Sequence, residues 1–310
     1  MDSPNRSHAC IESSFDIALD QLVSQVTSRG DLPHVSVSDQ LEMIDQLCGC
    51  EMGRFILERR GVNGYWTDYI LHHPFSRNET PHDLHQRTYS PMELFLLTRS
   101  PNVLAHRERG GIFQKMLQQH VRPGAVFASI PCGLMRDLLS LDLSRAADCR
   151  IVGIDIDPES LDHGRELAQH LGVADAEFIL GNAWSLGFDK AFDVITSSGL
   201  NCYEPEVARV LDLYRNFFIA LKPGGTLITS VYTYPPGHAK PTDWDLTVCN
   251  TEDMLMDAIL FGDILQAKWR NFRSASELED DFRSVGFTDV AVHFDSRRMY
   301  PTITARRPLA

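Results

Sequence analysis

The sequence lacks a long apolar run, since no stretch approaches the roughly 18 consecutive apolar residues of a membrane-spanning helix. Residues 1–14 are polar and lack the apolar core of a secretory signal. Cysteine is also sparse: seven residues are scattered along the chain without a C-x-x-C pair. An odd, scattered set favours reduced thiols over a disulfide framework. We therefore expect a cytoplasmic protein that makes no use of a membrane.

Basic residues are in short supply. The 310 residues include 29 Lys and Arg against 42 Asp and Glu, which gives a formal net charge of −13. A surface that binds nucleic acid usually carries an excess of positive charge. The composition thus favours a small-molecule substrate over a nucleic acid, and it leaves the oligomeric state open.

The N-terminal part of the chain has no strand pattern. Apolar residues recur at helical spacing over 13–29, 39–60 and 64–71, and further helices are indicated over 91–98 and 107–120. Residues 1–12 are expected to be disordered. We predict a helical N-terminal cap region over residues 1–120 and a second domain over residues 121–310.

The second domain begins with a nucleotide-binding pattern. A buried strand at 125–130 leads through the turn Pro131-Cys132-Gly133 into a helix at 134–139, and a second buried strand at 150–155 ends on Asp155. That acid lies 22 positions after Gly133, close to the roughly 20 expected for a carboxylate that binds ribose hydroxyls. The G-x-G-x-x-G dinucleotide fingerprint is missing, because only one of its glycines is present.

Strands and helices alternate after this unit. Further strands are indicated at 176–180, 192–197, 226–231, 290–294 and 299–305, with an aromatic and proline-containing insertion at 233–274. Alternation of this kind specifies a mostly parallel sheet covered by helices on both faces. The predicted fold class is therefore α/β, with a Rossmann-like seven-stranded sheet preceded by the helical region.

The order of these landmarks resembles the class I S-adenosylmethionine-dependent methyltransferases, over roughly residues 123–306. The landmarks are the turn after the first strand, the acid that ends the second, Gly181-Asn182-Ala183 after the third, and Leu221-Lys222-Pro223-Gly224-Gly225 before the fifth. The resemblance implies S-adenosylmethionine as the cofactor and methyl transfer as the activity. Pro131 and Met135 depart from the family's glycine-rich turn, and Ser129 stands where the family often has an acid.

The resemblance also implies which residues hold the cofactor. Asp155 would accept two hydrogen bonds from the ribose, and Asn182 would contact the adenine amino group beside Ala183 and Trp184. The predicted cofactor-binding residues are Ser129, Pro131, Cys132, Gly133, Asp155, Ile156, Asn182, Ala183, Trp184, Ser197 and Ser198.

Substrate residues are predicted from polar-aromatic segments that could cover the site. Methyl displacement mainly requires alignment of the reactants and exclusion of water, so we expect no metal and assign no catalytic residue. The predicted substrate-binding residues are Tyr65, Tyr69, Arg99, Tyr203, Tyr232 and Trp244. For the aromatic residues of the N-terminal part, packing between helices is an equally good interpretation.

Two other functions are compatible with the nucleotide-binding pattern. An NAD-dependent dehydrogenase is disfavoured, because phosphate-binding glycines are missing and Pro131 removes an N–H donor from the turn. A non-catalytic protein that binds S-adenosylmethionine is suggested by the altered turn. We predict a methyltransferase that acts on a nucleophilic oxygen or nitrogen of a small molecule in a capped cleft.

Overall fold

The computed structural model describes residues 14–73, 87–144, 146, 148–173 and 175–309. The chain divides into two compact units, Met1–Leu104 with Leu246–Lys268, and Ala105–Asp245 with Trp269–Ala310. Residues 1–12, predicted to be disordered, lie outside the described part. Among the described residues, no helix has the length and apolarity needed to cross a membrane.

The first unit is helical. Its elements up to residue 98 are α1 (Phe15–Arg29), α2 (Val37–Cys48), α3 (Glu51–Arg59), α4 (Gly64–His72) and α5 (Pro91–Thr98). Serine caps define two of the starts: Ser36 and Ser90 each accept a hydrogen bond from the backbone three residues on, and Pro91 opens α5. The helical stretch predicted over 39–60 is interrupted between α2 and α3, and Cys50 caps α3 by accepting from the Gly53 N–H.

Part of the predicted insertion folds with these helices. It forms η4 (Leu246–Val248), α10 (Thr251–Asp257) and a π-helix, η5 (Ala258–Ile264). Ser100 Oγ donates to Asp257 Oδ1 at 2.7 Å, and the Asn102 N–H donates to Asp257 Oδ2 at 2.9 Å. Ser100 Oγ also accepts from the Val103 N–H at 3.2 Å, so it caps α6 (Pro101–Gln118), which enters the second unit at Ala105. The compact units therefore do not follow the predicted boundary at residue 120, and the assignment of a cap domain stays a prediction.

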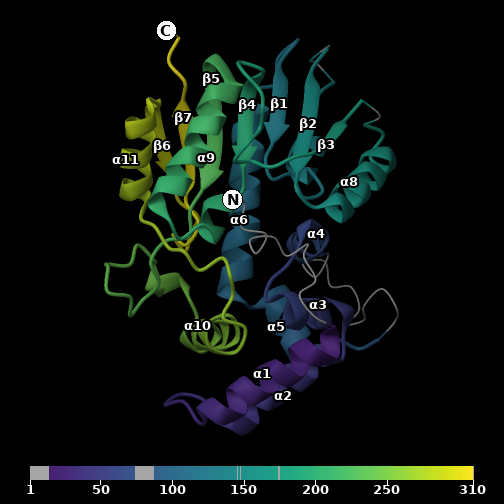
Figure 1. The fold of residues 1–310 in the computed structure, drawn as a ribbon, viewed down its shortest axis with the longest axis vertical. Helices are drawn as coiled ribbons and strands as arrows, with labels where there is room; N and C mark the ends of the chain where they lie inside the picture. The colour runs from purple at the N-terminus through teal and green to yellow at the C-terminus, as the bar shows by residue number, and fades with distance from the viewer. Residues whose placement is uncertain (1–13, 74–86, 145, 147, 174, 310) are drawn as a thin grey trace. The chain divides into compact units, whose positions relative to one another are not determined.

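The second unit contains a seven-stranded sheet in the order β3-β2-β1-β4-β5-β7-β6, which can be followed from right to left in Figure 1. The first five strands are parallel neighbours, and β7 runs antiparallel to both β5 and β6. The strands are β1 (Val126–Ser129), β2 (Arg150–Asp155), β3 (Glu177–Leu180), β4 (Phe192–Ser197), β5 (Leu221–Ser230), β6 (Thr288–His293) and β7 (Thr302–Arg306). This arrangement confirms the predicted fold class.

Helices cover both faces of the sheet because successive strand residues point to opposite sides. On one face, Ala128, Val152 and Ile195 pack in a core cluster with residues of α9 (Val207–Ala220) and α11 (Ala275–Val285). On the other face, their neighbours Phe127, Ile151 and Val194 pack with residues of α6, α7 (Arg136–Leu139) and α8 (Pro158–His170). A short 3-10 helix, η3 (Leu200–Tyr203), follows β4.

Two predicted strand boundaries are wrong. The Lys222-Pro223-Gly224-Gly225 segment belongs to β5, which starts at Leu221 rather than at residue 226. The last strand starts at Thr302 rather than at residue 299, because Asp295 holds the preceding turn. Its carboxylate accepts from the Tyr300 N–H at 2.7 Å and the Met299 N–H at 3.3 Å.

Candidate functional site

The turn after β1 and the acid that ends β2 hold each other in place. The Gly133 N–H donates to Asp155 Oδ2 at 2.8 Å, and the Asp157 N–H donates to Asp155 Oδ1 at 3.0 Å. Gly133 has a φ of +49°, a conformation that glycine adopts more readily than other residues. Residues predicted from widely separated motifs are thus in direct contact at the carboxyl edge of the sheet.

Asp155 is a buried acceptor with spare capacity. It is 8% exposed, and burial raises the pKa of its carboxyl above the ordinary value, against the effect of its N–H donors. A carboxylate has about four lone-pair positions, and the two backbone donors occupy two of them. The remaining two suit the pair of hydroxyls of a ribose, so this acid fits the predicted cofactor. Ile156, which follows it, is 53% exposed.

The unusual side chains of the turn pack against a glycine in β2. A Cβ atom added at Gly153 would lie 2.9 Å from both Cys132 Sγ and Met135 Sδ. Met135 is fully buried and has a φ of +57°. Gly153 therefore provides the space for Cys132 and for Met135, which stands where the family has a glycine. A glycine in the middle of a buried strand is the sequence signal for such a close approach.

An acid on α7 accompanies Ser129. Ser129 Oγ lies 3.0 Å from Asp137 Oδ2 and 3.2 Å from Oδ1, and donates to that carboxylate. Burial raises the pKa of Asp137 to about 6, although hydrogen bonds from Ser129 and the backbone act in the opposite direction. The family often has an acid at the position of Ser129. In this chain Asp137 places a carboxylate directly beside that position. Sequence analysis missed Asp137 because its proximity to Ser129 depends on the path of the turn.

The segment after β3 is fixed by its own hydrogen bonds. Asn182 Oδ1 accepts from the Trp184 N–H at 2.9 Å, and Trp184 Nε1 donates to the Arg209 carbonyl at 2.9 Å. The Arg209 guanidinium lies 5.7 Å from the centre of the Trp184 ring, and Ala183 is buried. Trp184 is therefore held against α9, while Asn182 keeps a second lone pair on its amide oxygen.

A buried arginine meets the segment after β4. Arg109, on α6, is 4% exposed, and its Nη2 donates to Ser198 Oγ at 2.6 Å. Ser197 is buried, and its carbonyl accepts from Thr229 Oγ1 at 2.7 Å. Ser198 is exposed. Sequence analysis missed Arg109, because nothing in the local pattern of α6 indicates that this arginine is buried.

Aromatic rings stack beside the same strand ends. Tyr232 lies between Tyr300 and Trp244, with ring centres 4.5 Å and 5.9 Å away and interplanar angles of 11° and 24°. Trp244 Nε1 donates to the Thr233 carbonyl at 3.3 Å. Tyr203, at the end of η3, is half-buried, and burial raises the pKa of its hydroxyl. Three of the predicted substrate residues are therefore in the sheet-containing unit.

The other three predicted substrate residues lie in the first unit. Tyr65 and Tyr69 make edge contacts with Trp66, at 5.1 Å and 5.5 Å between ring centres. Arg99 Nε donates to Asp253 Oδ1 at 3.0 Å, and the two residues form an ion pair. The predicted contact of Tyr65, Tyr69 and Arg99 with a ligand at the sheet stays a prediction.

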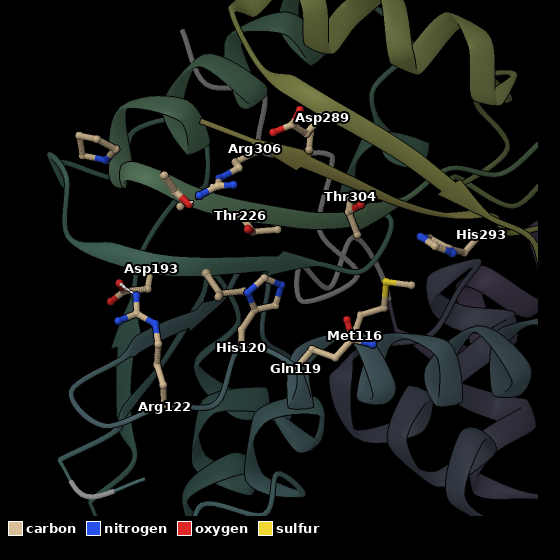
Figure 2. Close-up of a pocket in the computed structure, with 15 residues that line it drawn as sticks. Met116, Gln119, His120, Arg122, Asp193, Thr226, Asp289, His293, Thr304 and Arg306 are labelled. Carbon is tan, nitrogen blue, oxygen red and sulfur yellow. Dashed lines mark hydrogen bonds and ion pairs between the residues drawn. The ribbon is translucent and has the colours of Figure 1, made fainter. Parts of the chain in front are cut away.

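A hollow of about 590 Å³ lies at the opposite edge of the sheet, where β4 and β5 begin and β7 ends (Figure 2). In the figure, His120 and Arg122 face Thr226 and Arg306 across it, and Arg122 pairs with Asp193. None of the predicted site residues lines it. In open α/β sheets ligands bind at the carboxyl ends of the strands, so this hollow is not the candidate site.

Comparisons with known proteins identify a methyltransferase domain in this chain. A family model described as a methyltransferase domain matches residues 130–277. The demethylmenaquinone methyltransferase of Symbiobacterium thermophilum is 27% identical over 207 residues, which cover 58% of this chain and 79% of that protein. The corresponding enzyme of Lactococcus lactis is 24% identical over 199 residues, covering 59% and 77%.

A solved structure matches nearly the whole chain. It is a Bordetella parapertussis protein described as a possible exported protein, with 36% identity, a TM-score of 0.87, and coverage of 99% of this chain and 100% of that one. The family match and the two relatives agree with the geometry of the turn after β1 and the acid after β2. The chain belongs to the class I S-adenosylmethionine-dependent methyltransferases.

Proposed function

We propose that this methyltransferase transfers the methyl group to a nucleophilic oxygen or nitrogen of a small molecule at the carboxyl ends of β4 and β5. The observation that carries the proposal is the stack of Tyr300, Tyr232 and Trp244 beside these strand ends. Flat aromatic faces suit the apolar body of a small molecule. The names of the two relatives, demethylmenaquinone methyltransferases, also describe small-molecule substrates.

Several residues are proposed to hold S-adenosylmethionine. Asp155 would accept from the ribose hydroxyls, with Ile156 and Ala183 beside the adenine and Asn182 accepting from its amino group. The carboxylate of Asp137 would face the ammonium of the methionine end. The remaining members of this proposed set are Ser129, Pro131, Cys132, Gly133, Trp184, Ser197 and Ser198.

The bound cofactor supplies an electrophilic methyl group on a sulfonium. The chain's contribution is to align the acceptor with that group and to exclude water, which favours displacement. Tyr203, Tyr232 and Trp244 are proposed to orient the acceptor. That the first unit covers the site through Tyr65, Tyr69 and Arg99 is a proposal from the sequence, as are a cytoplasmic location and the absence of a nucleic-acid partner.

Transfer of a labelled methyl group tests the proposal. The protein would be incubated with methyl-labelled S-adenosylmethionine and, separately, with small metabolites passed through an ultrafilter, with the retained proteins, and with RNA. We expect label in the small metabolites, and none with Asp155→Ala at a low cofactor concentration. Label confined to protein or RNA would contradict the small-molecule assignment. Tight binding of S-adenosylhomocysteine without transfer to any fraction would favour the non-catalytic alternative.

A further inference from the structure

Arg109 is a buried cation that has few partners. Its Nη2 donates to Ser198 Oγ at 2.6 Å, and its guanidinium lies over the rings of Phe113 and Tyr300 at 5.6 Å and 5.5 Å. A guanidinium has five N–H donors. In the described part of the chain, Arg109 forms no ion pair, and the hydroxyl of Ser198 is its one hydrogen-bond acceptor. Most of its donor capacity is therefore unused.

The acid whose charge acts on Arg109 is already engaged. Asp295 is 1% exposed, and its negative charge raises the pKa of Arg109. Its Oδ2 accepts from the Tyr300 N–H, and its Oδ1 accepts from the N–H groups of Arg297 and Met299. Asp295 thus holds the turn before β7. Burial lowers the pKa of Arg109, and the nearby Tyr300, Cys202, Asp295 and Tyr203 act in the opposite direction.

A buried charge without a partner is costly, and such groups tend to be kept where a ligand uses them. Proteins bury arginine mainly with a carboxylate or phosphate that matches its planar fork. Among the residues that the structure describes, no carboxylate forms an ion pair with Arg109. A ligand anion would provide that partner and would recover the cost of burial.

The position of Arg109 indicates which ligand this is. Ser198 follows β4 and Tyr300 precedes β7, whereas Gly133 follows β1 and Asp155 ends β2 in the other half of the sheet. Gly199 also lies beside the guanidinium, since a Cβ added there would be 3.6 Å from Arg109 Nη1. Tyr300, which lies under the guanidinium, also stacks on Tyr232. The cation therefore adjoins the aromatic stack rather than the acid of β2.

We propose that Arg109 binds the carboxylate, or an equally compact oxyanion, of the methyl acceptor, so that the acceptor is an acid with an apolar or aromatic body. This inference rests on the proposed function, because it names the substrate class of the same site. A positively charged acceptor is disfavoured at this position, since Arg109 would repel it. The methionine carboxylate of the cofactor is the other source of the same chemistry, and the experiment separates the two.

Calorimetry with matched acids and amides tests the proposal. Benzoate is compared with benzamide, and decanoate with decanamide, on protein saturated with S-adenosylhomocysteine. We expect at least one acid to bind about tenfold or more tightly than its amide, as a charge-assisted hydrogen-bond pair predicts. Arg109→Met should abolish this difference. Arg122→Met removes the same charge at the opposite edge of the sheet and should preserve it.

A second variant and a second ligand complete the test. Arg109→Lys keeps the charge without the planar fork and should reduce the difference between acid and amide, which provides a result if Arg109→Met does not fold. If Arg109→Met weakens S-adenosylhomocysteine but not methylthioadenosine, which lacks the amino-acid end, the carboxylate belongs to the cofactor and the assignment to the acceptor is overturned.

Stability gives an independent readout. An arginine that awaits a ligand should cost stability in the free protein, so Arg109→Met should unfold at the same or a higher temperature. No difference between acid and amide in the wild type, or a difference that survives in both Arg109 variants, would overturn the proposal. Because S-adenosylhomocysteine is titrated first, a failure of cofactor binding would be seen separately from a failure of acid binding.

Discussion

The two halves of the carboxyl edge differ in charge and in how they are held. After β1 and β2, Asp155 and Asp137 present carboxylates that local backbone donors and Ser129 fix in place. After β4 and before β7, the buried charge is the cation Arg109, which contacts Ser198 and the ring of Tyr300. The first half suits hydroxyl and ammonium groups, and the second suits an anion beside aromatic rings.

The two halves also differ in how far apart their contributing residues lie in the sequence. In the acidic half, the hydrogen bonds of Asp155 and Asp137 join residues at most 22 positions apart. The cationic half is assembled by α6, the segment after β4 and the turn before β7, which are far apart in sequence. Because the first half presents carboxylates and the second a cation, we expect the ribose and ammonium of the cofactor to bind in the first half and the choice of acceptor to depend on the second.

The largest effect is expected from Asp155→Ala. Two charged hydrogen bonds to ribose hydroxyls contribute roughly 1.5–3 kcal/mol each, less what water replaces, so S-adenosylhomocysteine should bind at least about tenfold more weakly. Calorimetry measures this directly, with Asp193→Asn at the opposite edge as the control. An unchanged dissociation constant would show that Asp155 does not bind the ribose. The half of the edge after β1 and β2 would then not be the cofactor half.

Gly153→Ala should destabilise the acidic half through packing. The added methyl group would lie 2.9 Å from Cys132 Sγ and Met135 Sδ, and overpacking of a core typically costs about 1–3 kcal/mol. Denaturant unfolding measures the loss, and cofactor affinity should fall as the turn shifts.

Gly111→Ala is the matched control for that substitution. Gly111 lies within α6, and an added Cβ would meet nothing within 4 Å. The same methyl group should therefore stabilise the protein by up to about 1 kcal/mol. If both variants were equally stable, the turn would not depend on the space at Gly153.

Local sequence patterns predicted the sheet and part of the site, but not the contacts between segments far apart in the sequence. The fold class and the exact bounds of β2 and β4 followed from buried apolar runs. Motif order predicted Gly133 and Asp155 as cofactor-binding residues, because parallel strands end at one edge, but it did not predict the hydrogen bond between them. Arg109 and Asp137 could not be found in this way, since their burial and partners come from segments that meet only in the folded chain.

The pH dependence of cofactor binding is expected to report on Asp137. Burial raises the pKa of Asp137 from 3.8 to about 6, so its carboxylate is lost as pH falls through 6. Affinity for S-adenosylhomocysteine should then fall by up to about tenfold per pH unit below this pKa. Stability of the free protein should change in the opposite direction, because a raised folded-state pKa adds stability as pH falls from about 6 toward 4.

In the wild type, both the affinity for S-adenosylhomocysteine and the stability of the free protein should change with pH below about 6. Asp137→Asn should remove both dependences. Calorimetry and thermal unfolding between pH 5 and 8 would record them. A wild-type affinity that is constant across this range would contradict a role for Asp137 opposite the cofactor ammonium.

The smallest effect is expected from Trp244→Phe. The indole stacks on Tyr232 and donates to the Thr233 carbonyl, and aromatic pairs contribute roughly 0.5–1.5 kcal/mol. Binding of benzoate to the protein saturated with S-adenosylhomocysteine should weaken by about two- to tenfold, while the dissociation constant of S-adenosylhomocysteine stays unchanged. A loss confined to the cofactor would place Trp244 with the acidic half instead.

The most direct measurement is a crystal structure of the protein with S-adenosylhomocysteine bound. The account predicts both ribose hydroxyls on the Asp155 carboxylate, the ammonium beside Asp137, and the Arg109 guanidinium without a contact to the cofactor. A ribose held elsewhere, or the cofactor carboxylate paired with Arg109, would contradict the division of the carboxyl edge into a cofactor half and an acceptor half.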